Sequence, residues 1–170
     1  VEYILRNTIQ TALTVPDATL FTIYELLNNP PFRDRTVAKL DDPHLELFWR
    51  QEFTKAGDMQ RIKMAAGVTS KIGRFLFSSV ARRVIGQARS TIDFDRLMDE
   101  GKILICNFSK GLVGEDTSVL FGAMVLARLQ LASLRRARLP LESRREFYLY
   151  VDEFQNFATM SFVQMLSEAR

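Results

Sequence analysis

One segment near the end of the chain, residues 147–156 with the sequence FYLYVDEFQN, most limits the folds that this chain can adopt. Its first five residues are apolar or aromatic, without the polar alternation that a half-exposed strand shows. Such a run predicts a strand covered on both faces, as in the parallel sheet of an α/β protein. Two neighbouring carboxylates, Asp152 and Glu153, follow where this strand would end. Functional groups of parallel sheets gather beyond the carboxyl ends of the strands, so the pair is a candidate site.

The residues that follow the acidic pair predict the start of a helix. In residues 160–165, with the sequence MSFVQM, Ser161 and Gln164 have the spacing of a capping box. Strand, acidic pair, short loop and capped helix have the order of a Walker B element. In that element the Asp holds Mg²⁺, usually through water, and the following Glu polarises the attacking water. A solvated acidic turn is the alternative that the pair alone leaves open.

The sequence changes its periodicity near residue 90. Up to residue 89, apolar residues at helical spacing alternate with breaks such as the NNPP of residues 28–31, which indicates an all-α domain. Within it, Asp42 and Pro43 predict a helix start, and Trp49 belongs to the apolar stripe expected to anchor the core. The only histidine, His44, is expected to be solvated in the first turn of that helix.

Residues 90–170 indicate a second domain. The β-branched residues of 102–108 (KILICNF) predict a strand, and a long helix is expected from Glu115 to about Arg138. With the strand at 147–151 this order predicts part of a parallel α/β sheet, joined by a right-handed crossover. The fold class is therefore α/β with an all-α N-terminal part.

Composition limits the function only weakly. The net charge of +3 and a pI near 9.2 permit nucleic-acid binding without indicating it. The single cysteine, Cys106, lies in an apolar run, which predicts a buried and inert thiol. We find no run long and apolar enough to cross a bilayer and no signal peptide. Because the chain starts at Val1 and ends at Arg170 within a predicted helix, we interpret it as a piece of a larger protein.

The nucleotide site suggested by the acids is incomplete. The loop of residues 109–114 (SKGLVG) has two glycines, but no GxxxxGK[ST] phosphate loop occurs in the sequence. We therefore expect that the chain alone does not hydrolyse ATP. Asn107, at the end of the first predicted strand, is a candidate polar sensor near a phosphate.

Two stretches resemble a known family. Residues 147–156, followed by residues 166–170 (LSEAR), resemble the Walker B region and following helix of conjugative coupling ATPases, the TraD/TraG/VirD4-like proteins of the FtsK–HerA superfamily of ring-shaped DNA motors. Residues 99–111 (DEGKILICNFSKG) resemble the preceding strand of that family. The resemblance covers about residues 90–170 and implies a partial parallel P-loop sheet of RecA/FtsK type. Residues 1–89 match the inserted all-α domain of the family only in helical character and position.

The resemblance also implies roles and partners. Asp152 would bind Mg²⁺ through water, Glu153 would be the catalytic base, and Arg170 is a candidate arginine finger. ATP and Mg²⁺ would be the cofactors of the full-length protein, with no tight binding expected for this piece. The implied partners are DNA, identical subunits in a hexameric ring, and relaxosome or secretion-channel components. The implied location is the bacterial cytoplasm, with any membrane attachment through parts outside this chain.

Two other functions fit the same sequence. One is a non-catalytic helical module that recruits substrates or accessory proteins. The other is a secretion ATPase that does not handle DNA. A phosphate loop in the sequence upstream of Val1 would favour the DNA motor or the secretion ATPase over the helical module.

Overall fold

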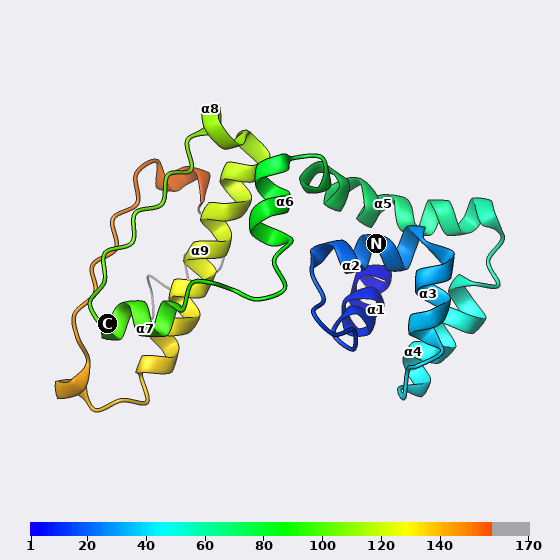
Figure 1. Cartoon of the computed structure of the whole chain (residues 1–170), viewed down its shortest axis with the longest axis horizontal. Helices are drawn as coiled ribbons and strands as arrows, with labels where there is room; N and C mark the ends of the chain where they lie inside the picture. Colours follow the sequence, from blue (N-terminus) through cyan, green and yellow to red (C-terminus); the bar gives the residue numbers. More distant parts are fainter. Residues whose placement is uncertain (158–170) are drawn as a thin grey trace. The chain divides into compact units, whose positions relative to one another are not determined.

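The computed structural model describes residues 1–157, and residues 158–170 lie outside the described part. The chain divides into two compact units, Val1–Arg89 (unit 1) and Ser90–Arg170 (unit 2). Both units are built mainly from helices (Figure 1). The predicted helix start at Ser161 and Gln164, and the predicted arginine finger Arg170, fall outside the described residues.

Unit 1 consists of helices joined by short connections. In chain order these are α1 (Glu2–Ala12), α2 (Leu20–Asn28), α3 (Pro30–Val37), α4 (Pro43–Leu47), the π-helix η1 (Phe48–Phe53), α5 (Asp58–Leu76) and α6 (Ser79–Ile85). Side-chain oxygens of Thr19, Asn29 and Asp42 accept hydrogen bonds from first-turn backbone amides. These caps explain where α2, α3 and α4 begin, because the first amides of a helix have no partner within it.

The NNPP segment at residues 28–31 ends one helix and also starts the next, and the second role was not predicted. It ends α2, as expected, but Asn29 also caps α3 and Pro30 is the first residue of that helix. Proline suits this position because its missing N–H would be unpaired there in any case. α3 therefore begins within the predicted break, and a single residue, Asn29, separates it from α2.

The core of unit 1 is centred on one tryptophan. Trp49 is completely buried, as predicted, and its ring packs edge-on against Phe48 and Phe53 at centroid distances of 4.8 and 5.1 Å. Its Nε1 donates a hydrogen bond to Thr11 Oγ1 at 2.7 Å, so the polar atom of the indole is satisfied inside the core. Thr11 Oγ1 in turn donates to Asn7 O, which links the tryptophan to the backbone of α1.

Unit 2 packs around one long helix, α9 (Glu115–Arg136). The other elements are α7 (Phe94–Asp99), α8 (Lys110–Val113) and the short 3₁₀ turns η2 (Leu141–Ser143) and η3 (Phe154–Asn156). Phe94 and Met98 of α7 form a buried cluster with Leu129 and Ala132 of α9. Arg135 adds a bidentate ion pair to Asp95, with N–O distances of 2.5 and 2.7 Å, and this pair lowers the pKa of Asp95. Apolar packing and an ion pair therefore both hold α7 against α9.

The prediction of a parallel sheet of P-loop type is wrong for the part of the chain that the structure describes. Residues 102–109 and 144–151 are neither helix nor strand, and no strand occurs within residues 1–157. Leu104 and Phe147 pack against the buried cluster of unit 2, whereas Ile103 and Tyr150 are 90% and 88% exposed. The β-branched and aromatic residues of the two segments favour an extended backbone. A strand also requires a hydrogen-bonded neighbouring strand about 4.8 Å away. Neither segment has such a neighbour among the described residues.

Two smaller expectations are also corrected. Cys106 is exposed, because no element within residues 1–157 covers the segment around it, although partial burial still raises the pKa of its thiol. α9 is long and apolar enough, by length and composition alone, to cross a membrane, which we did not expect from the sequence. Phe121, Leu126 and Leu129 of the same helix are buried within unit 2, and core helices of soluble proteins meet the same criterion.

Candidate functional site

The acidic pair lies in a tight turn at the end of the 144–151 segment. Both Asp152 and Glu153 are exposed, and Glu153 has a left-handed backbone with φ 49° and ψ 41°. Its amide donates a hydrogen bond to Asp152 Oδ1 at 2.9 Å, which stabilises the turn. Left-handed backbone is uncommon for residues other than glycine and is enriched at functional turns. The turn therefore fixes two carboxylates side by side at the start of η3.

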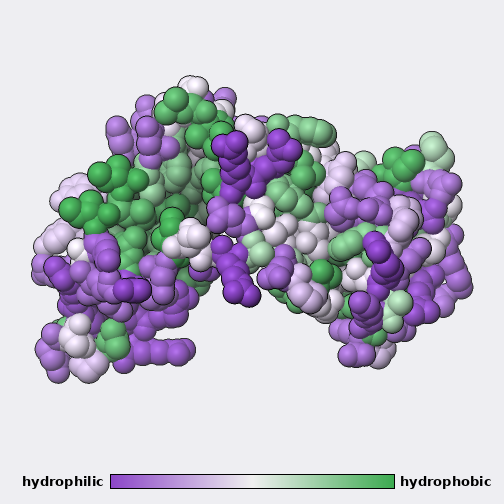
Figure 2. Space-filling model, in the orientation of Figure 1, coloured by the Kyte–Doolittle hydropathy of each residue, from purple (hydrophilic) through white to green (hydrophobic). Residues whose placement is uncertain are grey.

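A groove of about 1310 Å³ lies next to this turn. Its floor is formed by α9, including Gly122, Val125 and Leu129, and its walls are residues 101–111 and 145–153. The two walls are therefore the segments that the sequence predicted to be strands. Figure 2 shows apolar surface gathered over unit 2, and the exposed apolar residues in the walls include Ile103, Ile105, Tyr148 and Tyr150. The groove is thus apolar along the segments and acidic where the turn begins.

One polar network connects the two walls. Lys110 Nζ donates to Asn156 Oδ1 at 3.4 Å, and Asn156 Nδ2 donates to Glu153 Oε2 at 2.9 Å. Lys110 also forms an ion pair with Glu115 at 3.3 Å. The structure therefore brings the glycine-containing loop and the acidic turn together through a lysine and an asparagine. Neither Lys110 nor Asn156 was among our sequence candidates, because the contact spans 46 residues and neither residue type stands out alone.

The remaining sequence candidate in this region, Asn107, also lines the groove. Its Oδ1 accepts a hydrogen bond from the Ser109 amide at 3.0 Å, so it helps to form the turn before α8. Within residues 1–157 Asn107 makes no hydrogen bond to Asp152 or Glu153. The structure thus places it in the same groove as the acids but gives it a local structural contact.

The donor set suits a magnesium ion only in part. No group of three or more His, Cys, Asp or Glu side chains that could hold a metal occurs within residues 1–157. Asp152 Oδ2 has no hydrogen-bond partner in the described part, and Glu153 lies beside it. Mg²⁺ commonly keeps several waters and uses one or two carboxylates together with substrate phosphates. Two adjacent carboxylates therefore fit such an ion when the phosphates and waters supply the other ligands.

An aromatic side chain just after the acidic turn packs against α9 and its neighbours. The Phe157 ring lies 6.2 Å from Phe108, which in turn packs on Phe121 of α9 at 6.4 Å. A Cβ at Gly122 would approach the Phe157 ring to 2.2 Å, so only glycine allows this ring to rest on α9. Gly122 therefore helps to hold the turn that carries both acids.

We expect Gly122→Ala to destabilise unit 2 by about 1–3 kcal/mol, since the new methyl group must displace the Phe157 ring. Thermal unfolding followed by circular dichroism measures this change. Gly73→Ala is the matched control, because it also lies within a helix but its Cβ would meet only Phe77 at 3.9 Å. The control should leave the stability of unit 1 unchanged or raise it by up to about 1 kcal/mol. An equal gain in both variants would show that Phe157 does not pack on Gly122.

Comparisons of the chain with protein-family models, curated proteins and solved structures found no match.

Proposed function

We propose that this chain is part of an ATP-driven, hexameric DNA-translocating motor of the conjugation or type IV secretion type, which works in the bacterial cytoplasm. In it, unit 2 would contribute acidic residues to the ATP site and unit 1 would be a helical accessory domain. The main support is the contact of the Asp152–Glu153 turn, through Asn156, with Lys110 in the loop before α9. Two adjacent carboxylates and a lysine lie at the edge of one groove. The carboxylates can bind a metal ion, and the lysine can bind the negatively charged phosphates of a nucleotide.

The proposed roles follow from the chemistry of phosphoryl transfer. Asp152 would hold Mg²⁺ through a water molecule, with Oδ2 as the acceptor, because Oδ1 already accepts from the Glu153 amide. Glu153 would orient a water molecule and accept its proton as the water oxygen attacks the γ-phosphorus and the bond to ADP breaks. The groups that cradle the β- and γ-phosphates would come from outside these 170 residues, because the sequence has no phosphate loop. Arg170 would act on a neighbouring subunit's nucleotide, and Asn107 would contact a phosphate.

We expect Glu153→Gln, made in the complete motor, to reduce DNA-stimulated ATP turnover by about 10²–10⁴-fold, the usual contribution of a general base. Glutamine keeps the size of the side chain and an oxygen that can accept from Asn156, so the turn should survive. Steady-state phosphate release with and without DNA measures the effect. Glu146→Gln is the matched control, since Glu146 is exposed on the same segment and its carboxylate accepts a hydrogen bond from the neighbouring Tyr148 OH, away from the acidic turn.

The outcome separates the three candidate functions. Turnover that survives Glu153→Gln largely intact would exclude Glu153 as the base. Turnover that needs Glu153 but is not stimulated by single- or double-stranded DNA at any salt concentration would favour a secretion ATPase that does not handle DNA. A complete protein without ATP turnover would favour the interaction module.

One observation favours the interaction module over a catalytic role. Both acids already have local contacts, since Asp152 Oδ1 accepts from the Glu153 amide and Glu153 Oε2 accepts from Asn156. These contacts would suffice to explain an acidic pair as a turn that closes the segment before η3. On this alternative, Asp152→Ala would weaken the turn, because it removes the acceptor of the Glu153 amide, and would change no activity.

A further inference from the structure

Unit 1 contains a cavity that the proposed function does not use. It has a volume of about 650 Å³ and is bordered by residues of α2, α3 and α5. Two arginines, Arg33 and Arg61, line it together with Asp58. The rest of the lining is mostly apolar or carries small polar groups, namely Leu27, Pro30, Ile62, Ala65, Ala66, Asn28, Thr69 and Ser70. The cavity therefore combines positive charge with an apolar wall.

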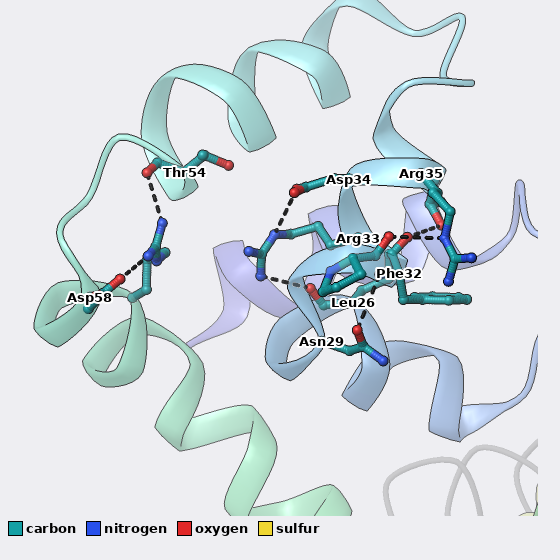
Figure 3. Close-up of polar contacts among 11 residues, drawn as sticks. Leu26, Asn29, Phe32, Arg33, Asp34, Arg35, Thr54 and Asp58 are labelled. Atoms are coloured by element: carbon teal, nitrogen blue, oxygen red, sulfur yellow. Dashed lines mark hydrogen bonds and ion pairs between the residues drawn. The ribbon is translucent and has the colours of Figure 1, made fainter.

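Arg33 is the unusual member of this set, because it is charged, buried and nearly without hydrogen bonds. The residue is only 4% exposed. Its Nη1 donates to Leu26 O at 3.5 Å, the upper limit for a hydrogen bond, and its buried Nε has no hydrogen-bond partner among residues 1–157. Asp34 Oδ1 lies 3.7 Å from Nε, which is an ion pair but too long for a hydrogen bond. Figure 3 shows these two contacts of Arg33.

The guanidinium group thus has unused donors in a site where water has little access. It carries five N–H donors, and one of its faces is covered by the Phe53 ring, whose centroid is 5.3 Å from Cζ. Burial lowers the pKa of Arg33 and the Arg61 charge lowers it further, while Asp34 acts in the opposite direction. Buried charges are normally paired, because an unpaired charge outside water is strongly unfavourable. The free N–H groups of Arg33 therefore lack an acceptor that an anion would supply.

Arg61 provides a second guanidinium group for the same anion. Its Nη1 donates to Thr54 O at 3.1 Å and its Nη2 forms an ion pair with Asp58. The Asp58 side chain is 84% exposed, so this pair is solvated and can rearrange at small cost. Arg33 and Arg61 each lie beside an aspartate, Asp34 and Asp58, so these four side chains carry no net charge. A singly charged carboxylate therefore adds less negative charge to the site than a doubly charged phosphate would.

We propose that this cavity binds a carboxylate attached to a residue with an apolar side chain, such as the C-terminal leucine of a partner protein. The carboxylate would lie between the guanidinium groups of Arg33 and Arg61, and the apolar side chain would lie on Leu27, Ile62 and Ala65. Arginine is the residue best suited to hold a planar carboxylate through two parallel hydrogen bonds. The site is independent of Asp152 and Glu153, so it stands whether or not the chain belongs to a motor.

The test uses N-acetyl-leucine as the probe, with the chain labelled with ¹⁵N. We expect saturable shifts of the arginine Nε–Hε resonances of Arg33 and Arg61 and a rise in the melting temperature. N-acetyl-leucinamide, which has the same side chain but no charge, should cause neither change. Inorganic phosphate should bind at least about tenfold more weakly than N-acetyl-leucine, because it offers no apolar group.

Variants assign the binding to this cavity. Arg61→Gln should weaken N-acetyl-leucine binding by about tenfold or more, since one charged partner is lost. Arg35→Gln is the matched control and should leave the affinity unchanged, because Arg35 is exposed on α3, donates to Pro31 O and does not line the cavity as described within residues 1–157. Circular dichroism checks that both variants fold. Equal binding of the acid and its amide, unchanged affinity in folded Arg61→Gln, or binding of phosphate alone would each overturn the proposal.

Discussion

Replacing Trp49 with alanine is expected to destabilise unit 1 by about 3–5 kcal/mol, the usual cost of removing a buried aromatic side chain. Trp49 is completely buried and packs on both Phe48 and Phe53, so the cavity left behind would lie at the centre of the core. The variant also removes the donor to Thr11 Oγ1. This amount is a large part of the total stability of a domain of this size.

Urea unfolding followed by circular dichroism measures this loss, since the variant has no tryptophan fluorescence. Phe77→Ala is the matched control, because Phe77 is 86% exposed at the end of α5 and should cost less than about 0.5 kcal/mol. Trp49→Phe should cost less than alanine, because it keeps a ring in the core. Comparable losses for Trp49→Ala and Phe77→Ala would contradict the description of the core.

Replacing Leu129 with alanine should have the largest effect on unit 2, with an expected loss of about 2–5 kcal/mol. Leu129 is 4% exposed and belongs to the cluster in which α9 meets α7. The same cluster holds Leu104 and Phe147, one from each segment that walls the groove. The substitution should therefore loosen the groove walls as well as the contact between α7 and α9.

Differential scanning calorimetry can detect this loss apart from the unfolding of unit 1, and hydrogen exchange can follow the groove walls. Leu131→Ala is the matched control, since Leu131 lies on the same helix but is 48% exposed. We expect faster exchange in α7 and α9 for Leu129→Ala and almost none for Leu131→Ala. Unchanged exchange in the Leu129 variant would show that the cluster does not hold unit 2 together.

The helices of unit 1 could be predicted because their signals are local. Asp42 and Pro43 act within one turn, and the apolar spacing that buries Trp49 lies within a single stretch of chain. The π-helical geometry of Phe48–Phe53 could not be predicted in this way. It depends on a change in hydrogen-bond register that residue types in a short window do not encode.

The strands were predicted wrongly for a related reason. Residues 102–108 and 147–151 have the composition of strands, but composition favours only an extended backbone. Whether a strand forms depends on a partner, and the described residues provide none for either segment. The same lack of cover explains why Ile103 and Cys106 are exposed rather than buried.

The sequence by itself determined the helical character of unit 1, which residue anchors its core, and that two carboxylates follow one another at residues 152 and 153. These properties arise from interactions within a few residues along the chain. Only the tertiary structure decided that Lys110 and Asn156 join the acidic turn, and that Arg33 is buried beside Arg61 with its Nε lacking a hydrogen-bond partner within residues 1–157. These properties depend on which distant segments pack together, because burial and pairing, rather than residue type, determine what a charged side chain can bind.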